Sequence, residues 1–331
     1  MKHIIFFMLF LFSMVSAASA DYLDNVQSRG YLICGVPDGL KGLSYINEHG
    51  EYVGFYAEIC RGIATAVLGS KDAVEFVPIS ERDRALLSLS KREVDVVSGP
   101  IAFTVAQDVL YDVVATTPVY YDTKRLMVHA YDRNKTAAIL AKEKKTFCYV
   151  KGISSNLELA NYLKRDLKDL NVTEYNTYSQ LAKAFTKRNC DALYEEYSVL
   201  KAIENFAALE NVRINNEILS YSVISPMISN NGKKWENIVK WSVNALIAAE
   251  DKGVDLQNVS YLGKNEVTKR FNLNENTVRK MGFLPDFIYN EVSSVGNYGD
   301  IYNRTIMREL GISRGINVSG KKGGSLYSPS F

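Results

Sequence analysis

Residues 74–99 read VEFVPISERDRALLSLSKREVDVVSG, and this pattern decides the class of fold. A short β-like run, VEFVPI, precedes a segment with a helical period, ERDRALLSLSKRE, and a second apolar run, VDVVSG, follows it. Two strands joined by a helix form a βαβ unit, in which the strands run parallel because the helix carries the chain back to the same end of the sheet. The stretch therefore predicts an α/β fold.

The same alternation continues on both sides of this stretch. YLICGV (31–36) and a helical segment around Cys60 come before it. A second series begins near residue 124, where the runs RLMVHA, TFCYV, VTEYN and CDALYEE alternate with helical patterns. The strongest helical period follows at 233–253. Between the two series lies TTPVYYDTK (116–124), which has no helical period. We therefore expect two α/β units rather than one.

The first twenty residues have the features of a secretory signal peptide. Basic residues open the chain, residues 4–15 are apolar apart from Ser13, and SAASA (16–20) offers small residues at the two positions that signal peptidase reads. We predict cleavage before Asp21 and export of the mature chain. The alternative is an uncleaved membrane anchor, for which the apolar run is shorter than the ~20 residues that a spanning helix needs.

Composition and charge exclude further classes of protein. The formal net charge is +2, whereas binding to nucleic acid normally calls for a clearly basic face, so we expect no nucleic-acid partner. Hydrophobic residues make up 47% of the chain, which is ordinary for a packed globular protein. After the signal peptide no segment is long and apolar enough to span a bilayer.

Four cysteines, Cys34, Cys60, Cys148 and Cys190, meet an oxidising compartment once the chain is exported. Four cysteines allow three pairings. Cys34 and Cys60 fall in the first α/β series and the other two in the second, so we favour Cys34–Cys60 and Cys148–Cys190, one disulfide in each unit. The alternative is four buried free thiols, since cysteine also packs well as a small hydrophobic residue.

The sequence offers no constellation for catalysis. His49 and His129 have no metal-ligand neighbours at helical or hairpin spacing, and we expect both at or near the surface. There is no G-x-S-x-G nucleophile elbow and no phosphate-binding G-x-x-x-x-G-K-[ST] loop. We therefore expect a protein that is not an enzyme and that has no catalytic residue, metal or cofactor.

A set of motifs in fixed order resembles one family. The motifs are RGYLICGV, EYVGFYAEICRGIATAVLGS, VEFVPI, REVDVVS, NLELANYL, NCDAL, WENIVKW, NALIAAE and VGNYGDIYNR. Together they resemble the periplasmic general L-amino-acid-binding proteins of ABC importers, which belong to family 3 of the solute-binding proteins. The likeness runs from residue 29 to about residue 329 and includes that family's C-terminal extension around VGNYG.

The resemblance implies a two-lobed α/β fold of the type with two hinge crossings, in which parallel-rich sheets are flanked by helices. Lobe one is expected at 21–122 and 229–331, and lobe two at 123–228. The stretches 116–124 and 219–228 then form the hinge, with Tyr121, Asp122, Thr123, Ser225 and Pro226 as hinge residues. Closure is expected to be a population shift driven by contacts of the solute with both lobes.

The resemblance also implies where the solute binds. The predicted ligand residues are Ala102, Phe103, Gln107, Ser154, Ser155, Tyr194 and Glu196. In the family, the turn after the VDV strand supplies hydroxyls and an arginine that holds the α-carboxylate of the solute; here that turn is apolar and Gln107 stands at the arginine position. Glu196 stands where the family has the aspartate that holds the α-ammonium. Ser154 and Ser155 keep part of a helix start that donates to an anion.

The expected function is therefore the periplasmic solute-binding component of an ABC importer. Its partners are an amino acid or amine-like solute and an inner-membrane permease, and the protein is expected to be a monomer. Because Gln107 removes a positive charge while Glu196 keeps a negative one, the sequence predicts a solute with a cationic nitrogen and a neutral or absent carboxylate. The alternatives are a binding-protein scaffold with a sensing or interaction role, and an enzyme on the same scaffold.

Overall fold

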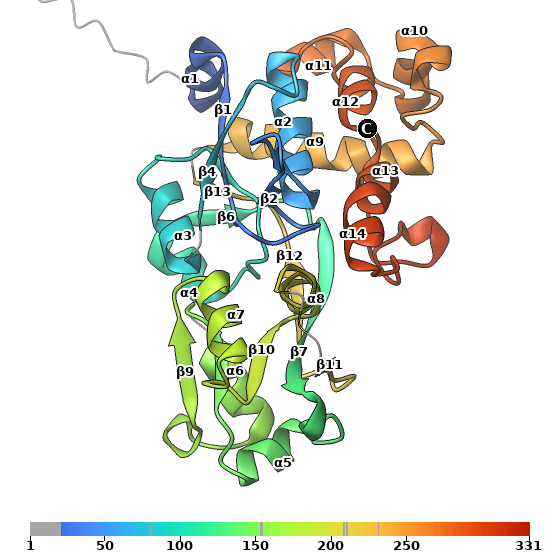
Figure 1. Cartoon of the computed structure of the whole chain (residues 1–331). Helices are drawn as coiled ribbons and strands as arrows, with labels where there is room; N and C mark the ends of the chain where they lie inside the picture. Colours follow the sequence, from blue (N-terminus) through green and yellow to red (C-terminus); the bar gives the residue numbers. More distant parts are fainter. Residues whose placement is uncertain (1–20, 80, 153–154, 208, 210, 231) are drawn as a thin grey trace, which may run out of the picture.

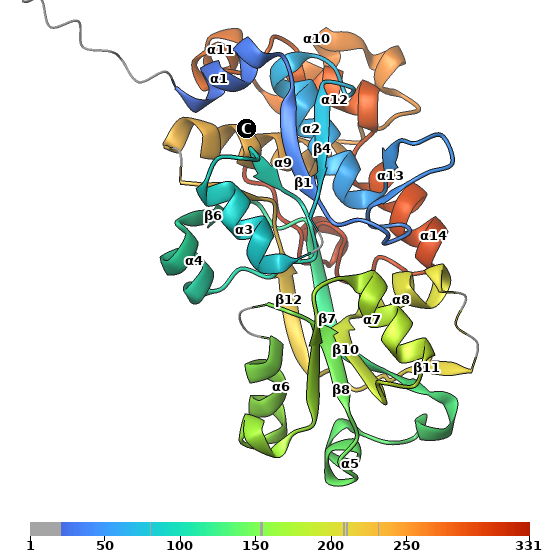
Figure 2. The same cartoon turned by 60° about the vertical axis from the view of Figure 1, so that its left-hand side comes forward.

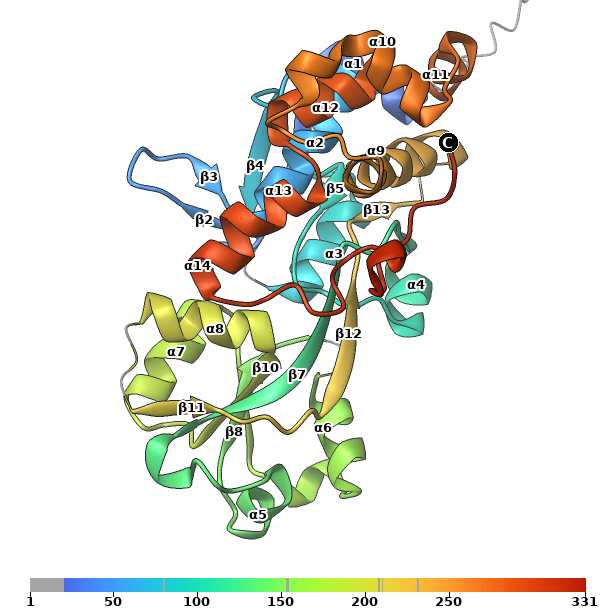
Figure 3. The same ribbon diagram turned by 90° about the vertical axis from the view of Figure 1, so that its right-hand side faces the viewer.

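The computed structural model describes residues 21–331, apart from residues 80, 153, 154, 208, 210 and 231. Two lobes stand one above the other, and strands β7 and β12 run between them (Figures 1 and 3). The blue N-terminal and orange-to-red C-terminal segments share the upper lobe, and the green and yellow segments form the lower lobe (Figure 1). The two-lobed α/β fold expected from the sequence is confirmed.

The upper lobe is built on a five-stranded sheet in the order β4-β1-β5-β13-β6. Its strands are β1 (Leu32–Val36), β4 (Val74–Pro78), β5 (Val96–Val97), β6 (Val113–Ala115) and β13 (Met227–Ser229), and a small hairpin adds β2 (Tyr45–Ile46) and β3 (Tyr52–Val53). The helices of its N-terminal part are α1 (Tyr22–Arg29), α2 (Phe55–Leu68), α3 (Arg82–Ser90) and α4 (Val105–Tyr111). Strand β13 brings residues 227–229 into this sheet, slightly before the expected boundary at 229.

The lower lobe has the strand order β11-β7-β10-β8-β9, and β12 pairs with β7 outside this path. Its strands are β7 (Tyr120–His129), β8 (Phe147–Val150), β9 (Val172–Tyr175), β10 (Ala192–Glu196), β11 (Val212–Ile214) and β12 (Ser220–Ile224). Its helices are α5 (Ala137–Lys142), α6 (Ser155–Leu163), α7 (Tyr178–Thr186) and α8 (Tyr197–Phe206), with 3₁₀ turns at Ala130–Asp132 and Leu167–Asp169. Figure 2 shows α7 and α8 on one side of this sheet and α6 on the other.

Both sheets are mixed rather than parallel-rich. The βαβ units give parallel pairs, as between β1 and β4, β1 and β5, β8 and β9, and β8 and β10. Every strand pair that involves β7 or β13 is antiparallel. β7 belongs to a chain segment that passes from one lobe to the other, and β13 follows such a segment. Both strands therefore run opposite to the neighbouring strands of the βαβ units.

The crossing segments contain regular strands, although 116–124 was described from the sequence only by its lack of a helical period. β7 and β12 pair over five residues each, from Tyr120 opposite Ile224 to Lys124 opposite Ser220. Because β7 and β12 pair with each other, their backbone N–H and C=O groups keep hydrogen-bond partners where the chain passes between the lobes. The expected hinge residues Tyr121, Asp122 and Thr123 lie within β7.

The C-terminal part of the chain begins with α9 (Lys233–Asp251), which packs beneath α2, and continues over the upper lobe. It contains α10 (Val259–Phe271), α11 (Glu275–Met281), α12 (Phe287–Val295), α13 (Tyr298–Tyr302), a π turn (Asn303–Met307), α14 (Arg308–Leu310) and a 3₁₀ turn (Gly320–Lys322). The Asn317 side chain accepts from the Tyr121 backbone N–H at 2.7 Å and donates to the Tyr121 carbonyl at 3.0 Å. The tail thus holds one hinge strand from outside.

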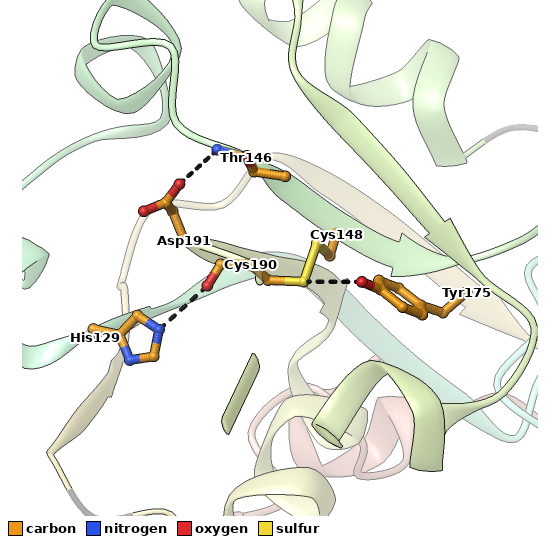
Figure 4. The surroundings of a disulfide bond; sticks show 6 residues. All are labelled: His129, Thr146, Cys148, Tyr175, Cys190 and Asp191. Carbon is orange, nitrogen blue, oxygen red and sulfur yellow. Dashed lines mark hydrogen bonds between the residues drawn. A yellow bond between two sulfur atoms is a disulfide. The ribbon is translucent and has the colours of Figure 1, made fainter. Parts of the chain in front are cut away.

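Each lobe contains one disulfide, Cys34–Cys60 above and Cys148–Cys190 below, which is the pairing favoured from the sequence. Figure 4 shows the lower disulfide between β8 and the start of β10, with the Tyr175 hydroxyl 3.9 Å from Cys190 Sγ. His129 is buried beside it, with Nε2 3.2 Å from the Cys190 carbonyl oxygen, and its ring stacks on Phe185. The expectation of a surface or boundary position for His129 is wrong, because the imidazole fills an aromatic layer of the lower core.

We expect the lower disulfide to contribute substantially to stability. It links residues 42 positions apart, and a crosslink over a loop of this length lowers the chain entropy of the unfolded state. The paired change Cys148→Ser with Cys190→Ser should lower the free energy of unfolding by about 2–4 kcal/mol in urea titrations. An unchanged unfolding midpoint would show that the crosslink is not formed in the folded protein.

Candidate functional site

The two lobes face each other across a narrow cleft. The upper face is formed by the ends of β1, β4 and β5 and by the turn Gly99–Pro100–Ile101, and Tyr178 at the start of α7 contributes from below. These residues enclose a small cavity of about 20 Å³. A space of that size holds about one water molecule. The lobes are therefore in close contact here, and the side chains that meet in the cleft can be identified.

Arg82 crosses this cleft. It is the first residue of α3, directly after β4 in the upper lobe, and it is 8% exposed. Its Nη2 donates to Glu195 Oε2 at 2.6 Å and to Glu196 Oε2 at 2.8 Å, both at the end of β10 in the lower lobe. It also hydrogen-bonds with the Tyr178 side chain. One guanidinium thus connects the two lobes through two ion pairs.

Gly152 in the lower lobe lets Arg82 come this close. A Cβ built on Gly152 would lie 2.9 Å from Arg82 Cδ, which is shorter than ordinary van der Waals contact. Any other residue at 152 would have to displace the Arg82 side chain. The contact between the lobes therefore depends on residue type on both sides of the cleft.

The two glutamates are held by the strand that carries them. β10 is buried throughout, and Glu195 Oε1 accepts from the Val150 backbone N–H at 2.7 Å. Glu196 occupies the N-cap position of α8, where the partial positive charge of the helix end favours a carboxylate. The Ser222 hydroxyl, on the hinge strand β12, donates to Glu196 Oε1 at 3.4 Å. Both carboxylates therefore have fixed positions on the lower face of the cleft.

Lys124 on β7 supplies a second buried cation. Its Nζ lies 2.7 Å from Glu158 Oε2 and 3.9 Å from Glu196 Oε1, and it sits over the Tyr194 ring at 5.3 Å from the centroid. Tyr194, one of the predicted ligand residues, thus packs against a cation, but the cation belongs to the chain itself. Two cations, Arg82 and Lys124, accompany the two buried carboxylates at the end of β10.

The surroundings act on the protonation of each glutamate differently. Burial raises the pKa of Glu195 above its ordinary value, although the guanidinium of Arg82 acts in the opposite direction. Burial also acts to raise the pKa of Glu196, but Arg82 and Lys124 outweigh it and hold that pKa below its ordinary value. Glu196 is therefore the carboxylate of the pair that stays ionised near neutral pH.

The predicted ligand residues of the upper lobe lie beside the cleft and do not line the small cavity. Ala102 pairs with Ile224 of β12 in an isolated bridge, and the Phe103 side chain is partly exposed. Gln107 is 5% exposed and forms a capping box with Thr104: its Oε1 accepts from the Thr104 N–H at 3.0 Å, and its own N–H donates to Thr104 Oγ1. A role for these three residues in binding the solute stays a prediction.

In the lower lobe, Ser154 lies outside the described residues, as does the side chain of Ser155, so their expected contacts with an anion stay a prediction too. Tyr194 is fully buried in the core of the lobe, and its hydroxyl lies 3.4 Å from Glu158 Oε2. Of the seven predicted ligand residues, Glu196 alone takes part in the ion pairs across the cleft that the structure describes.

The capping box of Gln107 leads to a test that separates its structural role from a binding role. We expect Gln107→Ala to lower the free energy of unfolding by about 1 kcal/mol, because the first turn of α4 loses an N-terminal partner. Urea titration measures the stability, and calorimetry with a bound solute measures the affinity. A loss of affinity without a loss of stability would contradict the capping role.

The hinge strand β7 also carries a buried carboxylate, that of Asp122. Asp122 is buried, and its two carboxylate oxygens accept from the backbone N–H groups of Thr123 and Ser198 at 2.7 and 3.2 Å. Burial raises the pKa of Asp122 to about 6. On the other crossing, the Pro226 carbonyl accepts from both the N–H and the hydroxyl of Thr116. Two of the predicted hinge residues, Asp122 and Pro226, therefore have defined hydrogen-bond partners.

Sequence reasoning missed Arg82, Glu195, Lys124 and Tyr178. One signal could have found Arg82: ERDR follows β4 directly, and ligands of α/β sheets bind beyond the carboxyl ends of the strands. The partners of Arg82 are 113 and 114 residues away, so the pairing itself could not be predicted. Over the described residues, no group of three or more His, Cys, Asp or Glu could hold a metal ion.

Two α/β lobes, two crossing strands and a charged cleft between the lobes define a binding protein that holds its ligand between two lobes. Residues 32–254 match the bacterial extracellular solute-binding proteins, family 3. The chain belongs to this family. No helix of the described chain has the length and apolar character to cross a membrane.

Related proteins cover almost the whole chain. The glutamate/glutamine/aspartate/asparagine-binding protein BztA of Rhodobacter capsulatus is 30% identical over 95% of this chain and 94% of its own. The general L-amino acid-binding periplasmic protein AapJ of Rhizobium johnstonii is also 30% identical, with the same coverage. A solved ABC-transporter periplasmic binding protein from Brucella ovis, with glutathione bound, superposes with a TM-score of 0.84 at 27% identity, over 94% of this chain and 99% of that one.

Proposed function

We propose that this protein is the solute-binding component of an ABC-type amino-acid importer and that it holds its solute between the two lobes. The observation that carries the proposal is the pair of buried carboxylates, Glu195 and Glu196, on the lower face of the cleft. An ionised carboxylate at a fixed position is the partner that an α-ammonium group requires. Family membership and relatives that are named for amino-acid binding support the same conclusion.

Glu196 is the residue to which we assign the ammonium. It lies at the position that the family resemblance gives to the ammonium partner, and its pKa is held below the ordinary value by Arg82 and Lys124. The N-terminus of α8 also favours its negative charge. A solute ammonium would take the place of one of these cations. The remaining residues predicted to contact the solute are Ala102, Phe103, Gln107, Ser154, Ser155 and Tyr194.

The charge of the cleft leads us to propose a solute class that differs from the one expected from the sequence. The prediction of a cleft with one extra negative charge counted Gln107 and Glu196 but not Arg82. Arg82 places a guanidinium on the upper face, opposite the carboxylates of the lower face. A zwitterionic solute therefore finds a charge partner on each lobe, and we propose an α-amino acid or a small molecule with an α-amino-acid group, such as glutathione in the Brucella ovis relative.

The cellular setting follows from the same family. We propose that residues 1–20 are removed on export, that the mature protein works in the periplasm as a monomer, and that its closed form docks on an inner-membrane permease. Lobe one would comprise 21–122 and 229–331 and lobe two 123–228. Tyr121–Thr123 and Ser225–Pro226 would form the hinge about which they move.

A thermal-shift screen tests the proposal. Residues 21–331 are incubated with the twenty α-amino acids, glutathione, simple alkylamines and small organic acids. We expect amino-acid-type solutes to raise the melting temperature, because a ligand that binds the folded state stabilises it by mass action. Simple amines lack the carboxylate and organic acids lack the ammonium, so both should raise the melting temperature less. A folded protein that responds to none of these compounds would instead favour a scaffold without transport.

A further inference from the structure

The C-terminal tail, residues 311–331, passes the first hinge strand and returns to the upper lobe. In Figure 3 it leaves α14, runs past β7 and ends beside α9. Phe331 at its end packs against Trp241 of α9, with ring centroids 4.9 Å apart. Arg314 near its start donates to both carboxylate oxygens of Glu250 on α9, at 2.6 and 2.9 Å. The tail is therefore fixed to the upper lobe on both sides of the point where it meets β7.

The tail meets β7 at Tyr121. The Asn317 side chain bonds both backbone groups of that residue: it accepts from the N–H at 2.7 Å and donates to the carbonyl at 3.0 Å. Arg314 Nε donates to the Asn317 carbonyl at 2.9 Å, so the ion pair with α9 also positions Asn317. At this one residue the tail thus gives the hinge strand a hydrogen-bonded neighbour.

Tyr121 is the residue at which β7 passes from the contacts of one lobe to those of the other. Just before it, the Tyr298 hydroxyl of α13 donates to the Val119 carbonyl at 2.7 Å and holds that residue to the upper lobe. Just after it, the Asp122 carboxylate accepts from the Ser198 N–H of α8 in the lower lobe at 3.2 Å. The torsion angles of Tyr121 can therefore change while both of these bonds remain.

The second crossing changes lobes at the same level. Ile224 forms an isolated bridge with Ala102 of the upper lobe, whereas the Ser222 hydroxyl donates to a carboxylate at the end of β10 in the lower lobe. Val223 lies between the two and is opposite Tyr121 in the register of β7 and β12. The pivot between the lobes therefore passes through the pair formed by Tyr121 and Val223.

We propose that the tail is a strap that holds this pivot in the closed arrangement of the lobes. Rotation between Tyr121 and Asp122 turns the Tyr121 carbonyl, because that carbonyl lies in the peptide plane that joins the two residues. The carbonyl then leaves Asn317, whereas the Tyr121 N–H belongs to the preceding peptide plane and stays. Opening thus costs one hydrogen bond. The strap lies beyond residues 32–254, which match the family, so it adds a restraint to the hinge.

Pulsed electron–electron resonance measures the distance between the lobes and tests the proposal. Spin labels are attached to residues 21–331 at Tyr261→Cys in the upper lobe and Lys168→Cys in the lower lobe, where both native side chains are exposed. Without any solute, we expect Asn317→Ala to raise the ratio of long to short distances by at least about threefold, as the loss of one hydrogen bond implies. The matched control Asn303→Ala changes an exposed asparagine of the π turn and should keep the wild-type ratio.

Asn317→Asp separates the two bonds of the strap. Its carboxylate still accepts from the Tyr121 N–H but cannot donate to the carbonyl, so we expect the lobes to part as they do in Asn317→Ala. Hydrogen exchange of the Tyr121 amide should stay slow in Asn317→Asp and become faster in Asn317→Ala. If Asn317→Ala does not fold, Asn317→Asp decides.

Equal distance distributions for the wild type and Asn317→Ala would overturn the proposal. A folded Asn317→Asp variant that keeps the wild-type distribution would overturn it too, because the Tyr121 carbonyl would then not be the group that opening releases. The proposal requires lobes that part but no particular solute, and none of these measurements uses one. Its failure would therefore leave the proposed function as it stands.

Discussion

Glu196→Gln is expected to weaken the binding of amino acids by about tenfold or more. The variant keeps the shape of the side chain but removes the negative charge that would face the solute ammonium. A hydrogen bond to a charged group contributes about 1.5–3 kcal/mol, and about 1.4 kcal/mol corresponds to a factor of ten in the dissociation constant. Arg82 also loses one of its two carboxylate partners, so part of the effect will pass through the upper lobe.

The control for this variant is Glu275→Gln, which makes the same change at the start of α11. The Glu275 side chain is 75% exposed and pairs with Arg279 on its own helix. It should bind amino acids as the wild type does. Calorimetric titration of the three proteins decides, and an affinity of Glu196→Gln equal to that of Glu275→Gln would remove Glu196 from the site.

Glu291→Met is expected to stabilise the protein by about 2 kcal/mol or more near neutral pH. Glu291 lies on α12, where this helix packs on α2 and α9, and it is 0% exposed. Neither of its carboxylate oxygens has a hydrogen-bond partner among the described residues. A buried polar group without a partner costs about 1–3 kcal/mol, and more if it is charged. Methionine has a similar volume and no such requirement.

The gain should increase with pH. Burial raises the pKa of Glu291 well above its ordinary value, so the folded protein keeps a proton that the unfolded chain releases above about pH 4. In that range the unfolded state binds fewer protons, and the stability of the wild type therefore falls as the pH rises. Urea titrations at pH 5 and pH 8 should show a larger gain at pH 8, whereas the exposed control Glu275→Met should show little. A gain that does not change with pH would mean that Glu291 is ionised in the folded state.

The local pattern of the chain was enough to predict most of the fold. The run VEFVPI and the period of ERDRALLSLSKRE correspond to β4 and α3, because burial of one face of a helix or of a whole strand shows in the spacing of apolar residues. The crossing strands could not be predicted in this way. Residues 120–124 and 220–224 pair with each other across about a hundred residues, and no local pattern predicts a pairing over such a separation.

Local sequence patterns also could not predict which side chains meet in the cleft. Glu196 was found through its position in a family motif, whereas Arg82 lies in a segment that reads as an ordinary amphipathic helix. Its importance comes from the meeting of α3 with the end of β10 across the cleft, which no local pattern encodes. Gln107 shows a different limit: its position in the motif suggests a ligand contact, which stays a prediction, whereas the helix cap that its geometry provides could not be predicted from the motif.

The decisive experiment is calorimetric titration of residues 21–331 with the amino acid selected by the thermal screen. We expect saturable binding of one solute per chain, with a negative heat-capacity change as the lobes bury apolar surface around it. We also expect the affinity to fall by about tenfold or more in Glu196→Gln. A folded protein that gives no saturable heat with any amino acid would contradict the claim that the cleft between these lobes is an amino-acid site.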